Sequence, residues 1–146
     1  MDIRFRPFGE TDLPEYRAWF AADEELSRRI SYPDDIWFGH VRRPENACWA
    51  SVDHTNTLIA VLQVDREEGT GYLDIALRPE RRGRGLGTAV LSAFLAGPGH
   101  GYGVIEGRIT PDNTAALALV RRCGFTLLPD PDDDGFARAI YTFSKT

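Results

Sequence analysis

Residues 77–88 read LRPERRGRGLGT, and this stretch joins a predicted strand to a predicted helix. The strand over 72–77 ends before Pro79, because proline lacks the N–H that a continuing ladder needs. Apolar residues at helical spacing then predict a helix over 86–96. Glycine lets the backbone between these elements adopt conformations that bulky residues resist and approach a ligand closely. The glycines of this turn are Gly83, Gly85 and Gly87.

The turn leads into a helix N-terminus, whose free N–H groups attract an anion such as a pyrophosphate. A nucleotide-triphosphate loop would end in Gly-Lys-Ser/Thr, but this chain has Gly87-Thr88 and no lysine there. A dinucleotide fingerprint would be spaced Gly-x-Gly-x-x-Gly, which the turn does not match. A tight turn without a ligand is the structural alternative. Positive charge beside the turn argues against that alternative, and it comes from Arg81, Arg82 and Arg84.

Periodicity predicts the other elements, working outward from this turn. The predicted strands cover 2–8, 48–52, 58–64, 104–109, 126–128 and 137–144, and the predicted helices cover 12–20, 23–30 and 113–122. Turn-forming residues over 53–57 predict a hairpin, and residues 66–69 predict the next turn. The aromatic stretch 31–46 is interpreted as a loop with room for one short helix.

Size and composition favour one globular domain. The chain has 146 residues, of which 42% are hydrophobic and 27% charged. The longest apolar run, 58–62, is far shorter than the roughly 20 residues of a membrane helix. The first six residues alternate charged and apolar side chains and lack the core of a signal peptide, so we expect a cytoplasmic protein.

Charge and cysteine content exclude further classes. The net charge of −5 disfavours nonspecific nucleic-acid binding, which needs clustered positive surface. Cys48 and Cys123 are too few for a disulfide scaffold and lack a paired metal spacing, so no metal site is predicted. We interpret both as small buried hydrophobic residues.

The stretch 82–87, RGRGLG, resembles the Arg/Gln-x-x-Gly-x-Gly/Ala signature of the GNAT superfamily of N-acetyltransferases. Residues 75–79 look like the splayed fourth strand of that family, and residues 113–125, NTAALALVRRCGF, look like its second conserved helix. The resemblance implies a single α/β (mixed α+β) domain over 1–146. Its fold would be a largely antiparallel mixed sheet of about seven strands with about four helices.

The resemblance also implies an enzyme that transfers acetyl directly from acetyl-CoA to a primary amine. Backbone N–H groups over 82–88 would bind the CoA pyrophosphate. The backbone of Ile75 and Leu77 would pair with the pantetheine arm, and an N–H at this strand end would stabilise the developing oxyanion. Asn113 would contact the same arm, although a helix N-cap role is the alternative and both can coexist. The implied cosubstrate-binding residues are Ile75, Leu77, Arg82, Gly83, Arg84, Gly85, Leu86, Gly87, Thr88 and Asn113.

The sequence departs from the family where catalytic groups are expected. Val120 stands where many members have a tyrosine that reprotonates the CoA thiolate. A water molecule or one of three side chains would substitute, with none favoured: Cys123, Tyr102 and Tyr141. Arg108 stands where some relatives have a catalytic glutamate.

Two carboxylates are candidates for the general base, Asp74 and Glu106. Each lies among apolar strand residues, where a carboxylate is costly unless it is paired or functional. The alternative for Glu106 is a salt bridge to Arg108 or another cation. Ordered water is a third way to deprotonate the amine.

The acceptor is expected opposite CoA, near the first two helices and the last loop, and a cationic amine with an apolar body would suit it. An acidic loop that is merely solvated is the alternative. A CoA-binding sensor without turnover and a nucleic-acid module are the rival classes, and a homodimer is left open. The candidate acceptor residues are Asp23, Glu24, Glu25, Tyr32, Trp37, Phe38, Asp130, Asp132, Asp133 and Asp134.

Overall fold

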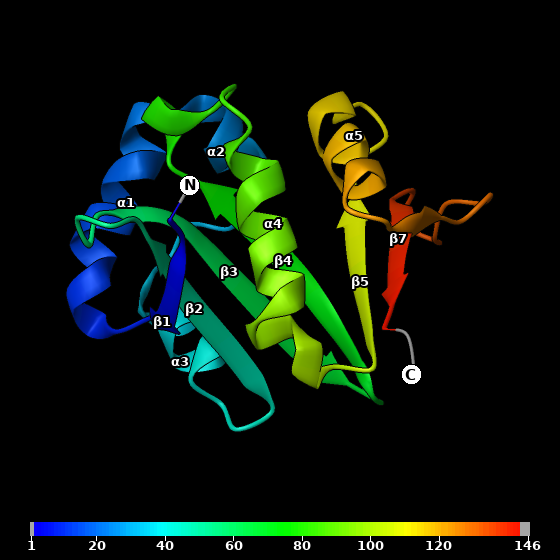
Figure 1. Ribbon diagram of the computed structural model, residues 1–146, viewed down its shortest axis with the longest axis horizontal. Helices are drawn as coiled ribbons and strands as arrows, with labels where there is room; N and C mark the ends of the chain where they lie inside the picture. Colours follow the sequence, from blue (N-terminus) through cyan, green and yellow to red (C-terminus); the bar gives the residue numbers. More distant parts are fainter. Residues whose placement is uncertain (1, 144–146) are drawn as a thin grey trace.

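The computed structural model describes residues 2–143, and its centre is one seven-stranded sheet with the order β1-β2-β3-β4-β5-β7-β6 (Figure 1). Every neighbouring pair is antiparallel except β4 and β5, which run parallel. The predicted largely antiparallel mixed sheet is therefore confirmed. The strands are β1 (Arg4–Pro7), β2 (Asn46–Val52), β3 (Leu58–Glu67), β4 (Thr70–Leu77), β5 (Val104–Ile109), β6 (Thr126–Leu127) and β7 (Ala137–Thr142).

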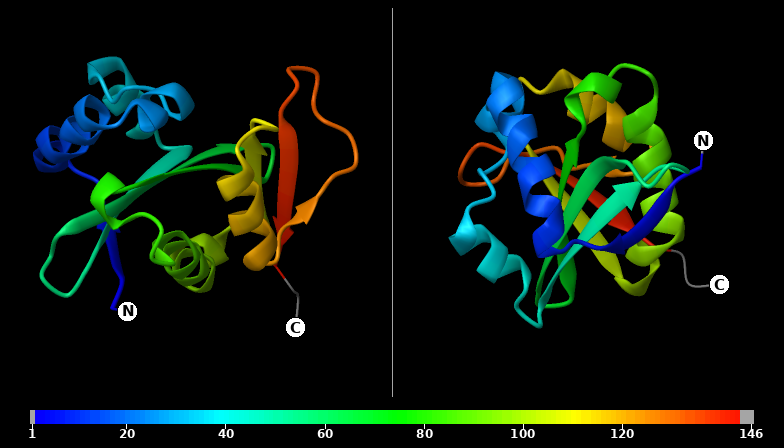
Figure 2. Two further views of the ribbon diagram at one scale, coloured as in Figure 1. Left: turned by 90° about the horizontal axis from the view of Figure 1, so that it is seen from above. Right: turned by 90° about the vertical axis from the view of Figure 1, so that its left-hand side faces the viewer.

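Helices cover both faces of the sheet (Figure 2). One face carries α1 (Leu13–Ala22), α2 (Glu24–Arg29) and α3 (Asp35–Val41), and the other carries α4 (Leu86–Ala96) and α5 (Thr114–Arg122). Two apolar cores result. One surrounds the aromatic side chains of α1, and the other contains the buried apolar residues of α4. Three short 3₁₀ turns complete the chain: η1 (Glu10–Asp12), η2 (Pro79–Arg81) and η3 (Pro98–Gly101).

The described residues contain five α-helices, in agreement with the expectation of about four and with the short helix allowed in 31–46. The additional helix is α3, in the stretch interpreted mainly as a loop. Asp34 caps it, since its carboxylate accepts a hydrogen bond from the Trp37 N–H at 2.8 Å. Trp37 also packs edge-to-face on Phe8, with ring centroids 5.6 Å apart. Tertiary packing of this kind stabilises a helix that has little signal in its own sequence.

The turn between β3 and β4 is tighter than residues 66–69 suggested. Both strands extend further, and only Glu68 and Gly69 connect them. Their φ angles are 49° and 83°, so both lie in the left-handed region. Two such residues in sequence are typical of the two-residue hairpin turn whose twist matches the strands.

The remaining element boundaries agree within a few residues. The helix over 86–96 and the strand over 104–109 are found as predicted. The first strand is shorter, and the last strand ends at Thr142, while Ser144 of the prediction lies outside the described residues. Cys48 and Cys123 are half-buried free thiols, and burial raises the pKa of Cys48 strongly. None of the helices within 2–143 has the length and apolarity to cross a membrane.

Candidate active site

The strands β4 and β5 pair only at their beginnings, where Thr70–Tyr72 lie beside Val104–Glu106. Beyond these residues the two strands separate, as Figure 1 shows, and we call this region the splay. The Arg78 N–H donates to the Ile59 oxygen of β3 at 2.9 Å. Because peptide groups alternate sides along a strand, those of residues 73, 75 and 77 point away from β3, toward the splay. Residues 75 and 77 lie beyond the last paired residues of β4 and β5, so their donors and acceptors form an open strand edge.

The loop and helix start over 82–88, which we call the Gly loop, supplies a second set of free donors. Within the described chain, the N–H groups of residues 83–88 donate to no backbone or side-chain acceptor. Gly83 and Gly85 have φ angles of 77° and 76°, and a Cβ at either would meet no atom within 4 Å. The Gly loop is thus an exposed backbone surface at the N-terminus of α4, which favours an anion.

Gly87 has a different role from the other two glycines. A Cβ there would lie 3.3 Å from the side chains of Leu77 and Leu119. This glycine therefore allows α4 to pack closely against β4 and α5. Glycine at position 87 is therefore required for packing within the protein, and it also leaves the backbone accessible to a ligand.

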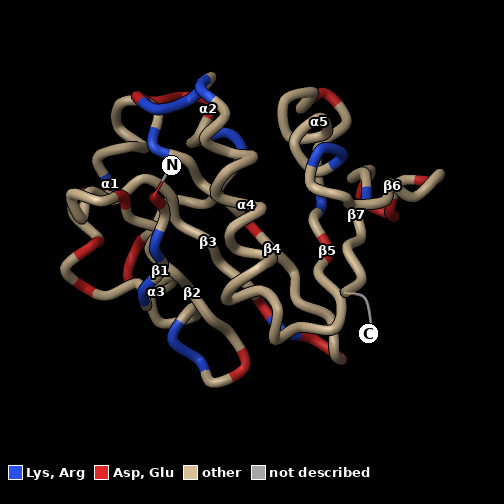
Figure 3. Tube along the Cα trace, viewed as in Figure 1, with Lys and Arg blue, Asp and Glu red and all other residues tan. Residues whose placement is uncertain are grey.

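The arginines around the Gly loop are not equivalent, although they gather beside α2 in Figure 3. Arg81 pairs with Asp53 at 3.2 Å, and Arg82 forms an ion pair with Asp23. Arg84 is exposed and has no acidic partner among the residues described. Arg84 is therefore the loop arginine whose charge is available to a phosphate.

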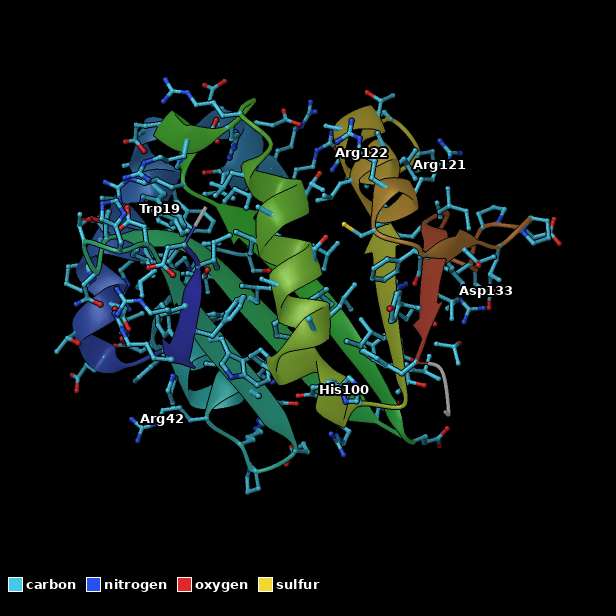
Figure 4. The ribbon with its side chains drawn as sticks, viewed as in Figure 1. Trp19, Arg42, His100, Arg121, Arg122 and Asp133 are labelled. Atoms are coloured by element: carbon cyan, nitrogen blue, oxygen red, sulfur yellow. The ribbon has the colours of Figure 1, made fainter. Side chains whose placement is uncertain are left out.

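Arg122 is a residue near the Gly loop that the sequence interpretation missed. It lies at the end of α5 (Figure 4), and its Nη1 is 3.4 Å from the Thr88 Oγ1 of α4. Arg121 precedes it, and both belong to the last helical turn, where cations stabilise a helix on their own account. Because cations at this position are common for that reason alone, nothing in the sequence indicated a role for Arg122 at the Gly loop.

Asn113 caps α5, because its Oδ1 accepts a hydrogen bond from the Ala116 N–H at 3.2 Å. The N-cap alternative is therefore realised in the structure. The Nδ2 group makes no hydrogen bond in the described chain and stays available as a donor. The cap fixes this amide at the splay end of β5, so a contact with the pantetheine arm stays a prediction that is compatible with capping.

Asp74 lies on the face of β4 that α1–α3 cover, since it alternates with Ile75 and shares a face with Ala76. Its side chain reaches solvent, yet protein atoms surround it closely enough that desolvation raises the pKa of its carboxyl group. The charge of Asp65 raises this pKa further, whereas Arg108 lowers it. No hydrogen bond or ion pair to Asp74 occurs within residues 2–143.

Glu106 is held differently. Only 5% of the residue is exposed, and its two oxygens accept hydrogen bonds from Arg138 at 3.0 and 2.8 Å. The salt-bridge alternative is thus realised, with Arg138 as the cation. Arg108 instead binds the acidic loop, donating to Asp132 at 2.8 Å and to Asp134 at 3.2 Å.

The family tyrosine position is occupied by a core residue. Val120 is 7% exposed and packs in the apolar core between α4, α5 and the sheet. Of the substitutes named from sequence, Cys123 and Tyr141 line the same cavity of about 440 Å³. Tyr102 does not line this cavity; it follows η3, before β5 begins, and lies under the guanidinium of Arg66.

A polar network lies beside Asp74 and was missed in the sequence. The Trp37 Nε1 donates to Gln63 at 2.8 Å, and Gln63 in turn donates to Asp65 at 3.2 Å. His40 Nε2 lies 2.8 Å from the other Asp65 oxygen. Gln63 is the register partner of Asp74 on the neighbouring strand. These residues come from α3 and β3, so only the fold brings them to Asp74.

An aromatic cluster on the same face contacts three of the predicted acceptor residues. Tyr16 of α1 is at its centre, 2% exposed, and burial raises the pKa of its phenol, with the charges of Cys48 and Asp74 adding to the effect. Trp37 and Phe38 contact the cluster, and Tyr32 packs on its edge while staying 53% exposed.

The predicted acidic residues fall into two groups. Glu24 and Glu25 are exposed on α2, whose N-cap is Asp23. The loop residues Asp130 and Asp133 are exposed, and Figure 4 shows Asp133 on the outer loop between β6 and β7. Asp132 organises this loop by accepting hydrogen bonds from the N–H groups of residues 134 and 136. The loop between β6 and β7 is therefore held by its own hydrogen bonds and is bound to β5 through Arg108.

Comparisons with known proteins agree with this architecture. Residues 13–125 match the model of the Acetyltransferase (GNAT) family. No curated protein matches the sequence. Among solved structures, the spermidine N-acetyltransferase from Vibrio cholerae in complex with CoA and spermine is similar, with a TM-score of 0.77 and 14% identity over 97% of this chain and 95% of that chain. The GNAT domain of S. lividans PAT gives a TM-score of 0.78 with 17% identity over 97% of this chain and 90% of that chain.

The low identities establish the fold, and the family match extends over most of the chain. The splay, the Gly loop at the start of α4 and the capped α5 occur in the order that the sequence resemblance implied. The chain belongs to the GNAT family of acetyltransferases.

Proposed function

We propose that this acetyltransferase moves the acetyl group of acetyl-CoA directly to a primary amine while both substrates are bound. The observation that carries the proposal is the Gly loop, where six consecutive N–H groups without acceptors adjoin the open edge of β4. A pyrophosphate on the loop would leave an attached arm free to run along that edge. The two features together suit a long phosphorylated thioester better than either would alone.

The cosubstrate would be held largely by the backbone. The pyrophosphate would accept hydrogen bonds from the N–H groups of residues 83–88, with the charge of Arg84 beside them. The peptide groups of Ile75 and Leu77 would pair with the amides of the pantetheine arm as an added strand does. Asn113 would donate its free Nδ2 to the same arm. These roles rest on the free donors and on the directions of the strand peptides.

The chemistry would be a direct attack. The amine nitrogen bonds to the thioester carbonyl carbon, and the charge that develops on the oxygen is stabilised by an N–H of the open edge, at Ile75 or Leu77. The C–S bond then breaks, and CoA leaves as a thiolate. The amine loses its proton to a base, for which Asp74 is assigned below, and the thiolate later takes a proton from solvent. No covalent enzyme intermediate is needed.

Asp74 is a better base than Glu106 on geometric grounds. Glu106 is buried, and its two carboxylate oxygens already accept hydrogen bonds from two nitrogens of the Arg138 guanidinium, so neither oxygen is free to contact an amine. Asp74 is accessible, unpaired and raised in pKa by desolvation, which moves it toward the working range of a base. We therefore assign the proton transfer to Asp74.

The acceptor would be a cationic amine with an apolar part, bound on the face that carries α1–α3. Support comes from the carboxylates of Asp74 and Asp65 beside an aromatic cluster, since cations are attracted to both. The similar Vibrio cholerae enzyme, described in complex with spermine, is consistent with an amine on this fold.

The same proposal includes the setting of the protein. Residues 1–146 would act as one domain, located in the cytoplasm, where free thiols such as Cys48 and Cys123 persist. A homodimer stays a prediction. A dodecameric structure of the Vibrio cholerae enzyme is also similar, with a TM-score of 0.71 and 14% identity over 97% of this chain and 94% of that chain. The mass of the present protein in solution would test the prediction of a homodimer.

The test is release of free CoA thiol from acetyl-CoA across a panel of amines and peptides. We expect thiol to appear with a cationic amine, at a rate that rises with pH because the attacking amine must be neutral. Mass spectrometry of the amine should show one added acetyl group. Tight binding of acetyl-CoA without thiol release for any acceptor would instead favour a CoA-binding sensor.

A further inference from the structure

In the splay, hydrogen bonds of the sheet do not hold the ends of β4 and β5 at a fixed separation. Beyond Tyr72 and Glu106 the described chain has no pairing between β4 and β5, so no ladder fixes the distance between their ends. We define the first arm as β4 with the Gly loop, and the second arm as β5 with the loop 110–112 that follows it. Figure 2 shows α2 lying near the open ends of these strands.

The N-terminal end of α2 is bound to the first arm. Asp23 is the N-cap, and its Oδ1 accepts a hydrogen bond from the Glu25 N–H at 3.3 Å. The same carboxylate pairs with the guanidinium of Arg82, and only 17% of the Asp23 side chain is exposed. The Arg82 side chain therefore adds an ion pair at the start of the Gly loop, beside the backbone hydrogen bond from the Arg82 N–H to the Pro79 oxygen.

The C-terminal end of α2 is bound to the second arm. The Arg29 Nη1 donates to the Asp112 carboxylate at 2.8 Å and also to the Thr110 hydroxyl. Glu25 orients the same guanidinium from within the helix, at 2.8 Å from its Nε. The Arg29 side chain is 17% exposed, and its hydrogen bond lowers the pKa of Asp112. The loop that it holds leads directly into Asn113.

We propose that α2 is a strap across the splay, and that Asp23 and Arg29 are positioning residues for the cosubstrate. One six-residue helix thus holds the two arms through ion pairs at its opposite ends. The gain is preorganisation: a Gly loop and a 110–112 loop that are already fixed lose less conformational entropy when the cosubstrate binds. The inference rests on the proposed function, because it assumes that CoA lies between these arms.

Arg29→Gln is the first test, with Arg28→Gln as its matched control. Both residues lie on α2 and pair with Glu25, but Arg28 is 63% exposed and, within the described residues, makes no hydrogen bond or ion pair with either arm. Its charge lowers the pKa of Asp112 from a distance, so the control also measures the effect of removing one positive charge from α2. We expect Arg29→Gln to raise the calorimetric Kd for CoA about 5-fold to 20-fold above the control. The kcat at saturating acetyl-CoA should stay within about 2-fold, because a positioning residue acts on binding.

A charge reversal separates positioning from general stability. Asp112→Arg alone should weaken CoA binding at least as much as Arg29→Gln, since it places two cations together. The double variant Arg29→Asp with Asp112→Arg should restore the Kd to within about 3-fold of the original chain. Loss of CoA affinity that the reversed pair does not rescue would contradict the strap.

Asp23→Asn tests the other end. Asparagine is an equally good N-cap, so this variant keeps α2 and removes only the charge that holds Arg82. We expect a Kd for CoA raised about 5-fold, with an unchanged melting temperature. Tighter CoA binding would show that Asp23 competes with phosphate for Arg82, and would overturn the inference. The inference would also be overturned if Asp23→Asn and Arg29→Gln both bound CoA with a Kd within 2-fold of that of the Arg28→Gln control. Failure of the unmodified chain to bind CoA would instead reject the proposed function.

Discussion

The two faces of the sheet differ in how their binding groups are supplied. At the Gly loop the groups are the N–H donors of residues 83–88, which follow one another along the chain. On the opposite face the groups are side chains that come from different elements, with Asp74 from β4, Asp65 from β3 and Tyr16 from α1. The first site is a property of one segment, and the second exists only in the folded protein.

This difference predicts how each face responds to substitution. A backbone site is damaged by a change of conformation and tolerates changes of side chain, whereas a side-chain site responds to the loss of a single group. If the proposed function is right, variants on the Gly loop should alter cosubstrate affinity, and variants beside Asp74 should alter turnover. Three substitutions test this separation, from the largest expected effect to the smallest.

Asp74→Asn should lower kcat with the amine by about 10²-fold to 10⁴-fold, the usual contribution of a general base. The Kd for CoA should stay within about 2-fold, because the carboxylate lies on the opposite face. In the unmodified chain, kcat should fall as the pH drops through the raised pKa of Asp74. A turnover loss below about 10-fold would show that water takes the proton.

The same variant should lower turnover but raise the stability of the folded protein at neutral pH. Because the folded chain raises the pKa of Asp74, the folded state favours its protonated form. The stability that protonation gives is present at low pH and is lost as the pH rises through the folded-state pKa. Asp74→Asn should therefore raise the melting temperature at pH 7 and change it little at pH 3. A lower melting temperature at pH 7 would indicate a structural role for this carboxylate.

Gly85→Val should weaken CoA binding about 30-fold to 100-fold. A β-branched residue strongly resists the φ of 76° found at Gly85, so the Gly loop would have to change shape. Gly135→Val is the matched control, because Gly135 has a φ of 85° and equally open surroundings but lies in the loop before β7. Both variants should lose similar stability, while calorimetry should find weakened CoA binding in Gly85→Val alone.

Val120→Tyr should change turnover less than 10-fold, although it restores the residue type of many family members. Val120 is packed in the core on α5, so a tyrosine overfills it and should cost about 1–3 kcal/mol of unfolding free energy. Turnover at saturation and chemical denaturation measure the two effects separately. A hundredfold gain in kcat would mean that thiolate reprotonation limits this enzyme and that the residue reaches the sulfur.

The sequence interpretation was accurate for features that depend on neighbouring residues and less accurate for features that depend on distant segments. The helix over 86–96, its glycines and the Asn113 cap were readable because each depends on residues within a few positions of one another. By contrast, α3 was interpreted mainly as a loop because its stability comes from packing on Phe8, far away in the chain. Local pattern carries no information on such contacts.

Charged pairs show this limit most clearly. In the sequence, Arg108 is the cation nearest to Glu106. In the structure, Glu106 instead binds Arg138, 32 residues away, because β7 lies beside β5. Arg29 and Asp112 are 83 residues apart and meet across the splay. No spacing rule connects such residues, since the fold alone sets their distance.

The sequence by itself determined the family, the Gly loop and the order of the elements, because backbone conformation and hydrophobic period are local properties of the chain. Only the tertiary structure decided which carboxylate is paired, which stays free and which helix crosses the splay. Those outcomes depend on desolvation and on Coulomb interactions over a few ångströms, and both are fixed when distant segments pack together.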